Sequence, residues 1–321
     1  MKKTDPFLLK PAAKDYIWGG NRIKSVFSKD IELTPLAETW ECSVHPDGPS
    51  VVAEGQFAGM TLKSVLDAHP EFCGREREEF PILIKFIDAE KRLSVQVHPD
   101  DDYAFRNENG QKGKTECWIV IDAEPGAKLV FGLKEEMSAE DIIASAADGT
   151  IEEKLNFIPV VAGDVIPVPA GTVHAIGAGI LLAEIQQNSN LTYRLYDWGR
   201  LGKDGKPREL HAKKAADVIR APAEIPETGI ERDTVPLSET VCSNECFKVD
   251  RMILTGISAQ IPLTGDSFSV LLCTKGRGAV KTDGTEKPFS AGDCIFFPAS
   301  DEPAYVSGDG EILISRFPDK Q

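Results

Sequence analysis

The chain lacks an excess of positive charge. Its 321 residues include 36 Lys and Arg against 51 Asp and Glu, which gives a formal net charge of −15. Nucleic acids and anionic membrane surfaces are bound by clustered positive charge. We therefore expect neither as a partner, and an anionic small molecule would need cations that are gathered locally at its site.

Long hydrophobic runs are also missing. No apolar run reaches the roughly 18 residues that a membrane-spanning helix needs. The first residues, MKKTDPFLLKP, have a basic start but neither an apolar signal-peptide core nor a small-residue cleavage site. We expect a soluble, cytoplasmic protein.

Cysteines are few and are not arranged in pairs. There are seven, an odd number, and none occurs in a CxxC motif. Cys242 and Cys246 have no second pair to complete a zinc site. The sequence therefore predicts neither a disulfide framework nor a structural zinc site.

The length and an internal repeat indicate two units. A single core stops growing near roughly 250 to 300 residues, and this chain is longer. AGDVIPVPA at 162–170 is echoed by AGDCIFFPA at 291–299. The second copy has Pro303 at the offset of His174 and Cys273 near the offset of His98, so we expect it to repeat the fold without metal ligands.

The domain boundary is expected in the Pro-rich, acidic segment 221–236. We predict a catalytic domain over 1–235 and a β domain without ligands over 236–321. The short, turn-bounded apolar segments predict a mainly β fold of two barrel-like units with a few short helices. Those helices are expected after Thr61, after Pro99, at 138–147 and 150–157, where capping-box patterns begin, and at 212–219.

A histidine at a turn is the first candidate metal ligand. In GDVIPVPAGTVH, residues 163–174, a strand and a tight turn lead to His174. The segment LSVQVH alternates, so Gln96 and His98 share one face of a strand, and Glu116 begins another strand. Two imidazoles, a carboxylate and an amide suit Zn²⁺ or a similar ion, the amide being the weakest donor. The alternative is a pair of histidines satisfied by backbone carbonyls.

Two sequence matches are set aside. The tetrapeptide VHPD occurs at 44–47 as well as at 97–100, but His45 has Ser43, not a glutamine, two residues earlier. Lys114 lies in a Gly-Lys-Thr triplet that resembles the end of a P-loop, yet Glu108 stands where the first glycine belongs and a strand follows. We expect neither a metal ligand at His45 nor a nucleotide-binding loop.

Three further polar residues have two interpretations each. Lys85, inside the apolar run 81–88, either faces a cavity or extends to water from an edge strand. With Asn188 to Asn190 as a hairpin turn, Glu184 and Arg194 would lie on neighbouring strands. They then form either part of a site or an ordinary cross-strand salt bridge.

These motifs together carry a resemblance. Residues 163–174 are similar to the second cupin motif, and Gln96, His98 and Glu116 resemble the first, with Gln in place of its first His and a longer gap before the Glu. More specifically, KFIDAEKRLSVQVHPDDDYA, GKTECWIV and GTVHAIGAGILLAEIQQNSNLTYRLYDWGR resemble the type I mannose-6-phosphate isomerase family in its short bacterial form. The likeness runs from Trp18 to the second, ligand-free cupin unit, and implies two jelly-roll β-barrel units.

The resemblance implies an enzyme with one Zn²⁺ per chain that interconverts mannose 6-phosphate and fructose 6-phosphate through an enediolate. It implies metal ligands at His98, Glu116, His174 and Gln96, catalytic roles for Arg194, Lys114 and Glu184, and substrate contacts from Lys85 and Trp18. Glu184, Lys114 and a water at the metal are open candidates for the proton carrier.

The expected local cations for the substrate phosphate are Lys85, Lys114 and Arg194. We expect a monomer or weak homodimer. The alternative function is a non-catalytic, metal-containing cupin that binds or senses a sugar phosphate. The chain has no room for the large helical insertion of longer family members. The resemblance therefore does not predict a lid or the contacts that a lid would make.

Overall fold

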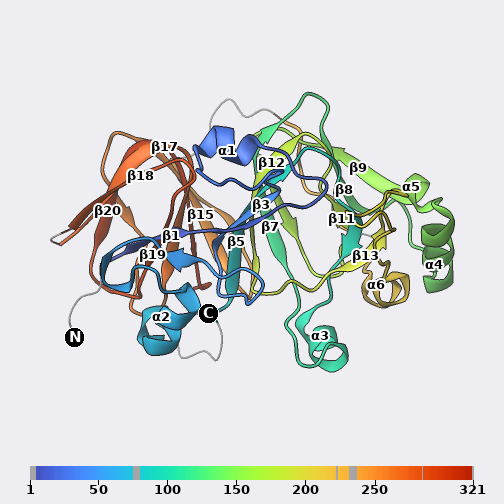
Figure 1. Ribbon diagram of the computed structural model, residues 1–321, viewed down its shortest axis with the longest axis horizontal. Helices are drawn as coiled ribbons and strands as arrows, with labels where there is room; N and C mark the ends of the chain where they lie inside the picture. The colour runs from blue at the N-terminus through green and yellow to red at the C-terminus, as the bar shows by residue number, and fades with distance from the viewer. Residues whose placement is uncertain (1–4, 75–79, 222, 231–236, 284, 320–321) are drawn as a thin grey trace.

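The computed structural model describes residues 5–74, 80–221, 223–230, 237–283 and 285–319. Their strands form three sheets in successive layers, with short helices around them (Figure 1). The predicted mainly β, cupin-like jelly-roll architecture is confirmed, although within the described residues the sheets do not close into continuous hydrogen-bonded barrels. Among the described helices, none is long and apolar enough to cross a membrane.

The first layer is a nine-stranded antiparallel sheet built from both ends of the chain. Its strands run in the order β14-β15-β20-β17-β19-β1-β4, with β16 beside β20 and β18 beside β17. Their bounds are β1 (Phe7–Lys10), β4 (Val51–Val52), β14 (Ser238–Ser243), β15 (Lys248–Thr255), β16 (Ala259–Ile261), β17 (Ser269–Thr282), β18 (Thr285–Ser290), β19 (Cys294–Phe297) and β20 (Ala304–Arg316). Because Phe7 of β1 pairs with Phe296 of β19, the first strand of the chain completes the sheet of the last strands.

The middle layer is a six-stranded sheet in the order β10-β7-β12-β5-β3-β2. Its strands are β2 (Ala12–Lys14), β3 (Glu38–Cys42), β5 (Ile82–Ala89), β7 (Glu116–Ala123), β10 (Val165–Val168) and β12 (Ile180–Gln187). Strand alternation gives this sheet two different faces. Ile84, Cys117 and Ile185 pack toward the nine-stranded sheet, whereas Lys85 and Glu184 point to the opposite side.

The third layer is a five-stranded sheet in the order β13-β6-β11-β8-β9. Its strands are β6 (Val95–Val97), β8 (Lys128–Leu133), β9 (Leu155–Pro159), β11 (His174–Ala175) and β13 (Tyr193–Tyr196). An apolar core lies between this sheet and the middle sheet, with Trp118 and Leu182 on one side and Leu129 and Phe131 on the other. The polar site is built at the edge of that core.

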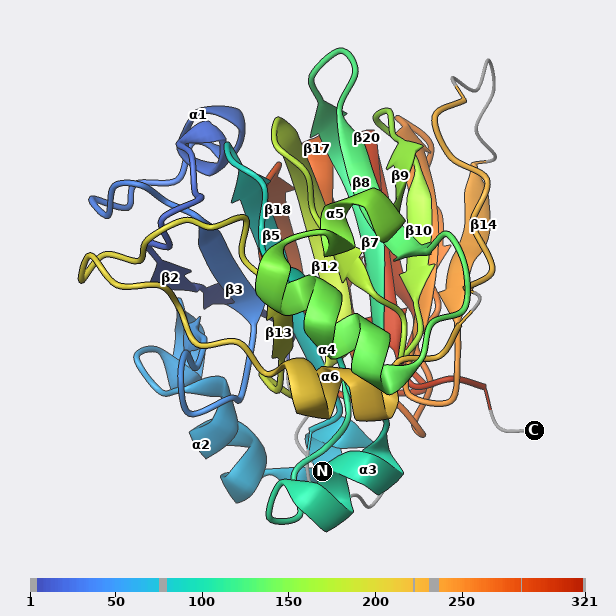
Figure 2. The same ribbon diagram turned by 90° about the vertical axis from the view of Figure 1, so that its right-hand side faces the viewer.

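The helices lie on the outside of the layers. They are α1 (Arg22–Phe27), α2 (Leu62–Ala68), α3 (Asp101–Asn107), α4 (Ala139–Asp148), α5 (Ile151–Lys154) and α6 (Ala212–Val218), with 3₁₀ turns η1 (Gly55–Phe57) and η2 (Pro70–Cys73). Figure 2 looks onto α4, α5 and α6, which cover the outer face of the five-stranded sheet. The predicted caps at Thr61 and Ser138 are confirmed, since each side chain accepts a hydrogen bond from the backbone three residues on.

Two predictions of local structure were wrong. Residues 188–190 do not join a hairpin, because β12 pairs in the middle sheet and β13 pairs with β6 in the next one. The segment connects two layers. The helix expected over 150–157 ends at Lys154, and Leu155 begins β9; Thr150 provides no side-chain cap.

The internal repeat is visible in backbone geometry. Gly163 and Gly292 both have φ +94°, a conformation that favours glycine. Asp164 accepts a hydrogen bond from the nitrogen three residues earlier at 2.9 Å, and Asp293 does so at 2.8 Å. Since Val120 and Cys273 donate to the carbonyls of these two aspartates, Cys273 matches Val120 and not His98.

The second copy of the turn lacks the carboxylate of the first. The two copies of the repeat are offset by 129 residues, so Gly292 matches Gly163 and Phe297 matches Val168. Val168 of β10 pairs with Glu116, whereas Phe297 pairs with Ser269. Ser269 therefore occupies the position of Glu116. The domain division at 235 stays a prediction; residues 231–236 lie outside the described residues, and β1 and β4 pair within the C-terminal sheet.

One apolar core joins the nine-stranded and middle sheets, and Phe296 lies at its centre. This side chain is fully buried and stacks on Phe7 and Phe268, with ring centroids 5.2 and 5.9 Å apart. We expect Phe296→Ala to lower the free energy of unfolding by about 3–5 kcal/mol, through lost burial and the cavity left behind. Urea unfolding measures this change. The control, Ile257→Ala, truncates a side chain that is 74% exposed and should change stability by less than about 0.5 kcal/mol; equal effects would contradict the assignment of this core.

Candidate metal centre and active-site pocket

Three of the predicted ligands meet at one buried point. His98 directly follows β6, Glu116 opens β7 and His174 opens β11. Their ligand atoms all lie within 4.8 Å of one another. Nε2 of His98 is 3.2 Å from Oε1 of Glu116, and Nε2 of His174 is 3.9 Å from Oε2. Two atoms that each bind one zinc ion at about 2.1 Å lie at most about 4.2 Å apart, so both distances fit a shared cation.

Hydrogen bonds fix which ring nitrogen of each histidine faces this point. Nδ1 of His98 donates to the carbonyl of Leu191, and Nδ1 of His174 donates to the carbonyl of Thr172, each at 2.9 Å. Both Nε2 atoms therefore carry the lone pair and point into the cluster, where a metal ion could bind them. The alternative that backbone carbonyls satisfy both histidines was right for the Nδ1 atoms only. These hydrogen bonds orient the two rings.

The charge state of the three side chains also suits a cation. Burial, with a contribution from Lys114, lowers the pKa of His98 to about 3, and burial lowers the pKa of His174. Burial opposes ionisation of Glu116, but Lys114 and His98 outweigh it and hold its pKa well below the usual range. At neutral pH the cluster offers two neutral imidazoles and one carboxylate, which are the forms that bind divalent metals.

The low pKa of His98 gives a stability prediction for the metal-free protein. The unfolded chain binds a proton at His98 near pH 6.5, whereas the folded chain binds it only near pH 3. The stability that neutral His98 contributes is therefore fully present above its pKa in the unfolded chain. It is lost as the pH falls from that pKa toward the pKa in the folded chain. We expect the urea concentration at the unfolding midpoint, measured in chelator, to be lower at about pH 5 than at about pH 7.5. The difference should be smaller in His98→Gln. The same drop in both proteins would contradict this assignment.

Gln96 touches the cluster without completing it. Its side-chain nitrogen lies 3.3 Å from Nε2 of His174, on the strand position that pairs with His174. A metal ion would be bound by the amide oxygen, which the same side chain presents after a half-turn of its amide group. The assignment of Gln96 as a fourth ligand stays a prediction.

A cavity of about 280 Å³ opens beside the cluster between the middle and five-stranded sheets. Six residues singled out from the sequence line it: Trp18, Lys85, Gln96, Lys114, Glu184 and Arg194. Lys114 connects the cavity with the cluster, because its Nζ pairs with Oε1 of Glu116 and lies 3.5 Å from Nε2 of His98. The residues predicted separately therefore share one pocket.

Lys85 faces this pocket, and its interpretation as an edge-strand lysine was wrong. β5 lies between β12 and β3, and the Lys85 side chain is 4% exposed. Its Nζ is 2.9 Å from Oε1 of Glu184 and 3.9 Å from Oε2 of Glu38. Burial alone would lower the pKa of Lys85, but these two carboxylates raise it above its ordinary value, so the ammonium stays charged.

A tryptophan links the metal cluster with Glu184. Nε1 of Trp118 donates to Oε2 of Glu116 at 2.9 Å and to Oε2 of Glu184 at 3.0 Å. The carboxylates of adjacent strands β7 and β12 are thus held in a fixed relation, since Trp118 pairs with Glu184 in the sheet. Polar groups run continuously from the cluster to Lys85.

Arg194 does not form the cross-strand salt bridge considered from the sequence. It lies on β13, in a different sheet from Glu184, and its Nη1 donates to the carbonyl of Glu209 at 2.8 Å. His211, expected at the surface, accepts a hydrogen bond from the Arg194 backbone and is partly buried. Arg194 lines the cavity, whereas His211 is not among the residues that line it.

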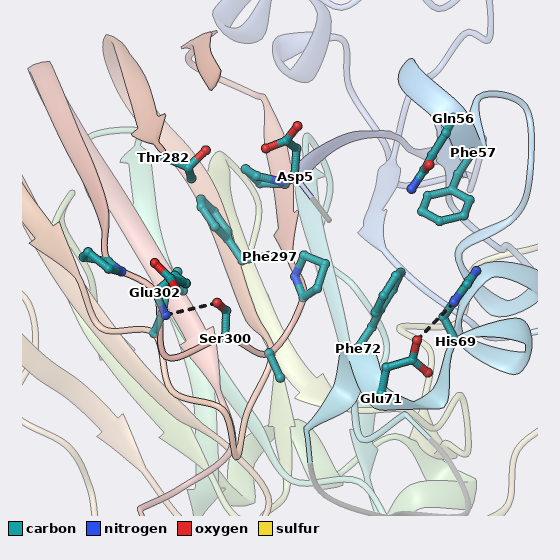
Figure 3. A pocket seen from close by; sticks show the side chains of 15 residues that line it. Asp5, Gln56, Phe57, His69, Glu71, Phe72, Thr282, Phe297, Ser300 and Glu302 are labelled. Carbon is teal, nitrogen blue, oxygen red and sulfur yellow. Dashed lines mark hydrogen bonds and ion pairs between the residues drawn. The ribbon is translucent and has the colours of Figure 1, made fainter. Parts of the chain in front are cut away.

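A larger cavity, of about 560 Å³, lies elsewhere and has the wrong charge for a phosphorylated sugar (Figure 3). It is formed by η1, η2 and loops of the nine-stranded sheet, with Phe57 and Phe72 on one wall. Among the described residues, its lining contains no lysine or arginine but includes Asp5, Glu71 and Glu302. These carboxylates would repel a dianion, so size does not decide which cavity is the active site.

Comparison with known proteins shows which family the chain belongs to. The model of the phosphomannose isomerase type I catalytic domain matches residues 7–113, and that of the mannose-6-phosphate isomerase cupin domain matches residues 238–317. Mannose-6-phosphate isomerase ManA of Bacillus subtilis (strain 168) is 37% identical over 320 residues, covering 98% of this chain and 99% of its own. The chain belongs to the type I phosphomannose isomerase family.

Two further relatives of this phosphomannose isomerase family member extend the likeness. Mannose-6-phosphate isomerase of Streptococcus mutans is 36% identical over 321 residues, covering 98% of both chains. A crystal structure of the mannose 6-phosphate isomerase from Bacillus subtilis superposes with a TM-score of 0.89 and 34% identity, covering 97% of this chain and 99% of that one. The fold is therefore shared, and the likeness extends over nearly all of each chain.

Three residues that line the pocket were not predicted from the sequence. Tyr16, Glu38 and Arg208 line the cavity beside the predicted residues. Glu38 could have been found, because a buried lysine at position 85 needs a nearby carboxylate. Arg208 gave no such signal, since it lies in a charged, Gly-containing stretch that is typical of a solvent-exposed loop.

Proposed function

We propose that this chain interconverts mannose 6-phosphate and fructose 6-phosphate. The observation that carries the proposal is the pocket in which the buried cluster of His98, Glu116 and His174 adjoins Lys114, Glu184 and Arg194. A metal cluster beside a cavity that holds acid–base groups and a guanidinium provides what an aldose–ketose isomerisation requires. Full-length relatives named mannose-6-phosphate isomerase support the same substrate pair.

The cofactor proposed is one Zn²⁺ per chain at His98, Glu116 and His174, with Gln96 as a fourth ligand. Two imidazole nitrogens and a carboxylate are the donor set of many catalytic zinc sites. When bound, such an ion supplies a Lewis acid that polarises a sugar oxygen. Nδ1 hydrogen bonds to backbone carbonyls keep both imidazoles in the tautomer that this role needs.

The reaction moves a proton between neighbouring carbons of the open-chain sugar. The proton leaves C2 of the aldose and returns at C1, and negative charge develops on the enediolate oxygens between the two steps. Arg194 is proposed to stabilise that charge, since a positioned guanidinium is worth most in a partly buried site. Glu184 and Lys114 are the groups proposed to carry the proton.

Glu184 is held in a defined position for this role. Lys85, whose charge is maintained by two carboxylates, binds one of its oxygens, and Trp118 donates to the other. Lys85 is thus proposed to position Glu184 as well as to contact substrate, and Trp18, which stacks on Tyr16 at the cavity wall, is proposed as a substrate contact.

Four broader predictions stay proposals. They are the cytoplasmic location, the absence of nucleic-acid and membrane partners, the monomeric or weakly dimeric state, and the division into domains 1–235 and 236–321. The net charge of −15 supports the second of these.

A coupled assay separates isomerisation from binding alone. The protein is incubated with mannose 6-phosphate, with and without a chelator, and the appearance of fructose 6-phosphate is followed. The proposal predicts turnover that the chelator abolishes and that added Zn²⁺ restores. A non-catalytic sugar-phosphate sensor would bind the same compound without forming product in either condition.

A further inference from the structure

The cations of the pocket are not equally free to bind an anion. The ammonium of Lys85 is paired with Glu184 and lies near Glu38, and the ammonium of Lys114 is paired with Glu116. Each lysine is therefore paired with a buried carboxylate. The expectation that these two lysines supply the charge for a phosphate group does not fit their contacts.

Two arginines share a single aspartate on the other side of the pocket. Nε and Nη2 of Arg208 donate to the two oxygens of Asp197 at 2.7 and 2.6 Å, in a bidentate pair. Arg200 donates to the same carboxylate at 2.8 Å. Two guanidiniums and one carboxylate leave one net positive charge, and the two arginines keep the pKa of Asp197 below its usual range against the effect of burial.

Arg194 adds a second uncompensated charge beside this group. Its guanidinium donates to a backbone carbonyl, and its Nε is buried without a hydrogen-bond partner. Burial and then the nearby Arg208 lower the pKa of Arg194 from its ordinary value, which reflects the closeness of the two cations. Arg194 and Arg208 thus both present positive charge to the cavity, whereas Arg200 pairs with Asp197 and is not among the residues that line the cavity.

The chain brings Arg208 back to the pocket by a short closed loop. Leu201 bridges to Pro207, and the nitrogen of Gly202 donates to the carbonyl of Lys206 at 2.7 Å. Asp197 then holds the returning Arg208, which lines the same cavity as Arg194 and Thr192. Because Asp197 occupies Nε and Nη2, Nη1 remains for another acceptor.

We propose that Arg208, positioned by Asp197, binds the phosphate group of the substrate, while the neighbouring Arg194 adds positive charge to the same side of the cavity. This inference rests on the proposed function, since it assigns the phosphate subsite of that reaction. A guanidinium matches phosphate geometry and keeps its charge in a partly buried site. The sugar carbons then extend from Arg208 toward Glu184 and the metal cluster across the cavity.

The test uses orthophosphate as a probe as well as the substrate. We expect Arg208→Gln to weaken calorimetrically measured phosphate binding to the zinc-loaded protein by roughly 10- to 100-fold, the cost of a charge-assisted bond to an anion. KM for mannose 6-phosphate should rise by a similar factor, while kcat stays within about threefold, because phosphate is held equally in ground and transition states. Metal content should not change.

Two variants separate binding from support of the loop. Arg200→Gln removes the other hydrogen-bond partner of Asp197, and Arg200 does not line the cavity. This variant should change phosphate affinity by less than about threefold. Arg208→Lys keeps the charge without the fork geometry and should recover part of the affinity; it also carries the test if Arg208→Gln does not fold. Asp197→Asn should raise KM, with kcat retained, as expected of a positioning residue.

Unchanged phosphate affinity and KM in Arg208→Gln would overturn the assignment. An equal loss in Arg200→Gln would assign the effect to the loop structure instead, and would overturn it as well. Failure of the proposed function is distinguishable, because phosphate binding is read without turnover: a protein that binds phosphate through Arg208 but forms no fructose 6-phosphate keeps this inference and loses the activity.

Discussion

Replacing His174 with alanine is expected to abolish both metal binding and turnover. The side chain contributes one of three ligands that lie within 4.8 Å of one another, and its orientation is fixed by a hydrogen bond to Thr172. With one of the two imidazole ligands removed, we expect metal content near zero and a loss of activity of at least about 10⁴-fold, because Lewis-acid stabilisation of the developing charge is worth several kcal/mol.

Metal content and the coupled mannose 6-phosphate assay, run on the same sample, measure this prediction. His69→Gln serves as the matched control, since His69 lines the other large cavity and stacks on Phe72. That variant should keep its metal and its rate. Turnover by His174→Ala with no bound metal would show that the cluster is not the reaction centre.

The second large effect is expected at Arg194. Its guanidinium faces the cavity from β13, whereas the three ligands lie just after β6 and at the starts of β7 and β11, so we expect its removal to leave the cluster in place. We expect Arg194→Ala to lower kcat by about 10³-fold, the upper range for loss of a group that stabilises an oxyanion. Metal content should remain at the wild-type level.

The split between kcat and metal content makes the Arg194 experiment informative. Arg194→Lys should recover part of kcat, because it keeps a positive charge without the planar fork. A near wild-type rate in Arg194→Ala would remove Arg194 from the catalytic residues. Loss of metal in that variant would show instead that Arg194 supports the fold of the cluster.

The metal ligands could be predicted from the sequence because each leaves a local signal. His174 ends a turn with characteristic proline and glycine spacing, and Gln96 and His98 occupy alternate positions of one strand. Glu116 begins the next strand. What spacing alone does not determine is whether three strands converge, and the structure shows that they do.

Other features could not be decided from local patterns. The run around Lys85 looks the same in an edge strand and in an interior strand, and only the neighbours β12 and β3 show which it is. Asn188 to Asn190 has turn composition, but composition does not say whether the next strand pairs with the previous one or enters another sheet. Both uncertainties concern tertiary pairing.

Arg208 illustrates the limit for the site itself. Its stretch is rich in Lys, Arg, Asp and Gly, which favours a solvated loop, and nothing in it marks one arginine as a pocket residue. The pairing with Asp197, eleven residues earlier, depends on how the loop folds back. Charges that serve a site and charges that only face water have the same sequence signature.

The central claim is that one metal ion at His98, Glu116 and His174 supports isomerisation of a sugar phosphate. Titration of metal-depleted protein with Zn²⁺, while conversion of mannose 6-phosphate is followed, tests this claim most directly. We predict that activity starts near zero, rises in proportion to added metal and saturates at about one equivalent per chain, the capacity of a single cluster. Full activity before any metal is added, or no conversion at saturating Zn²⁺, would contradict it.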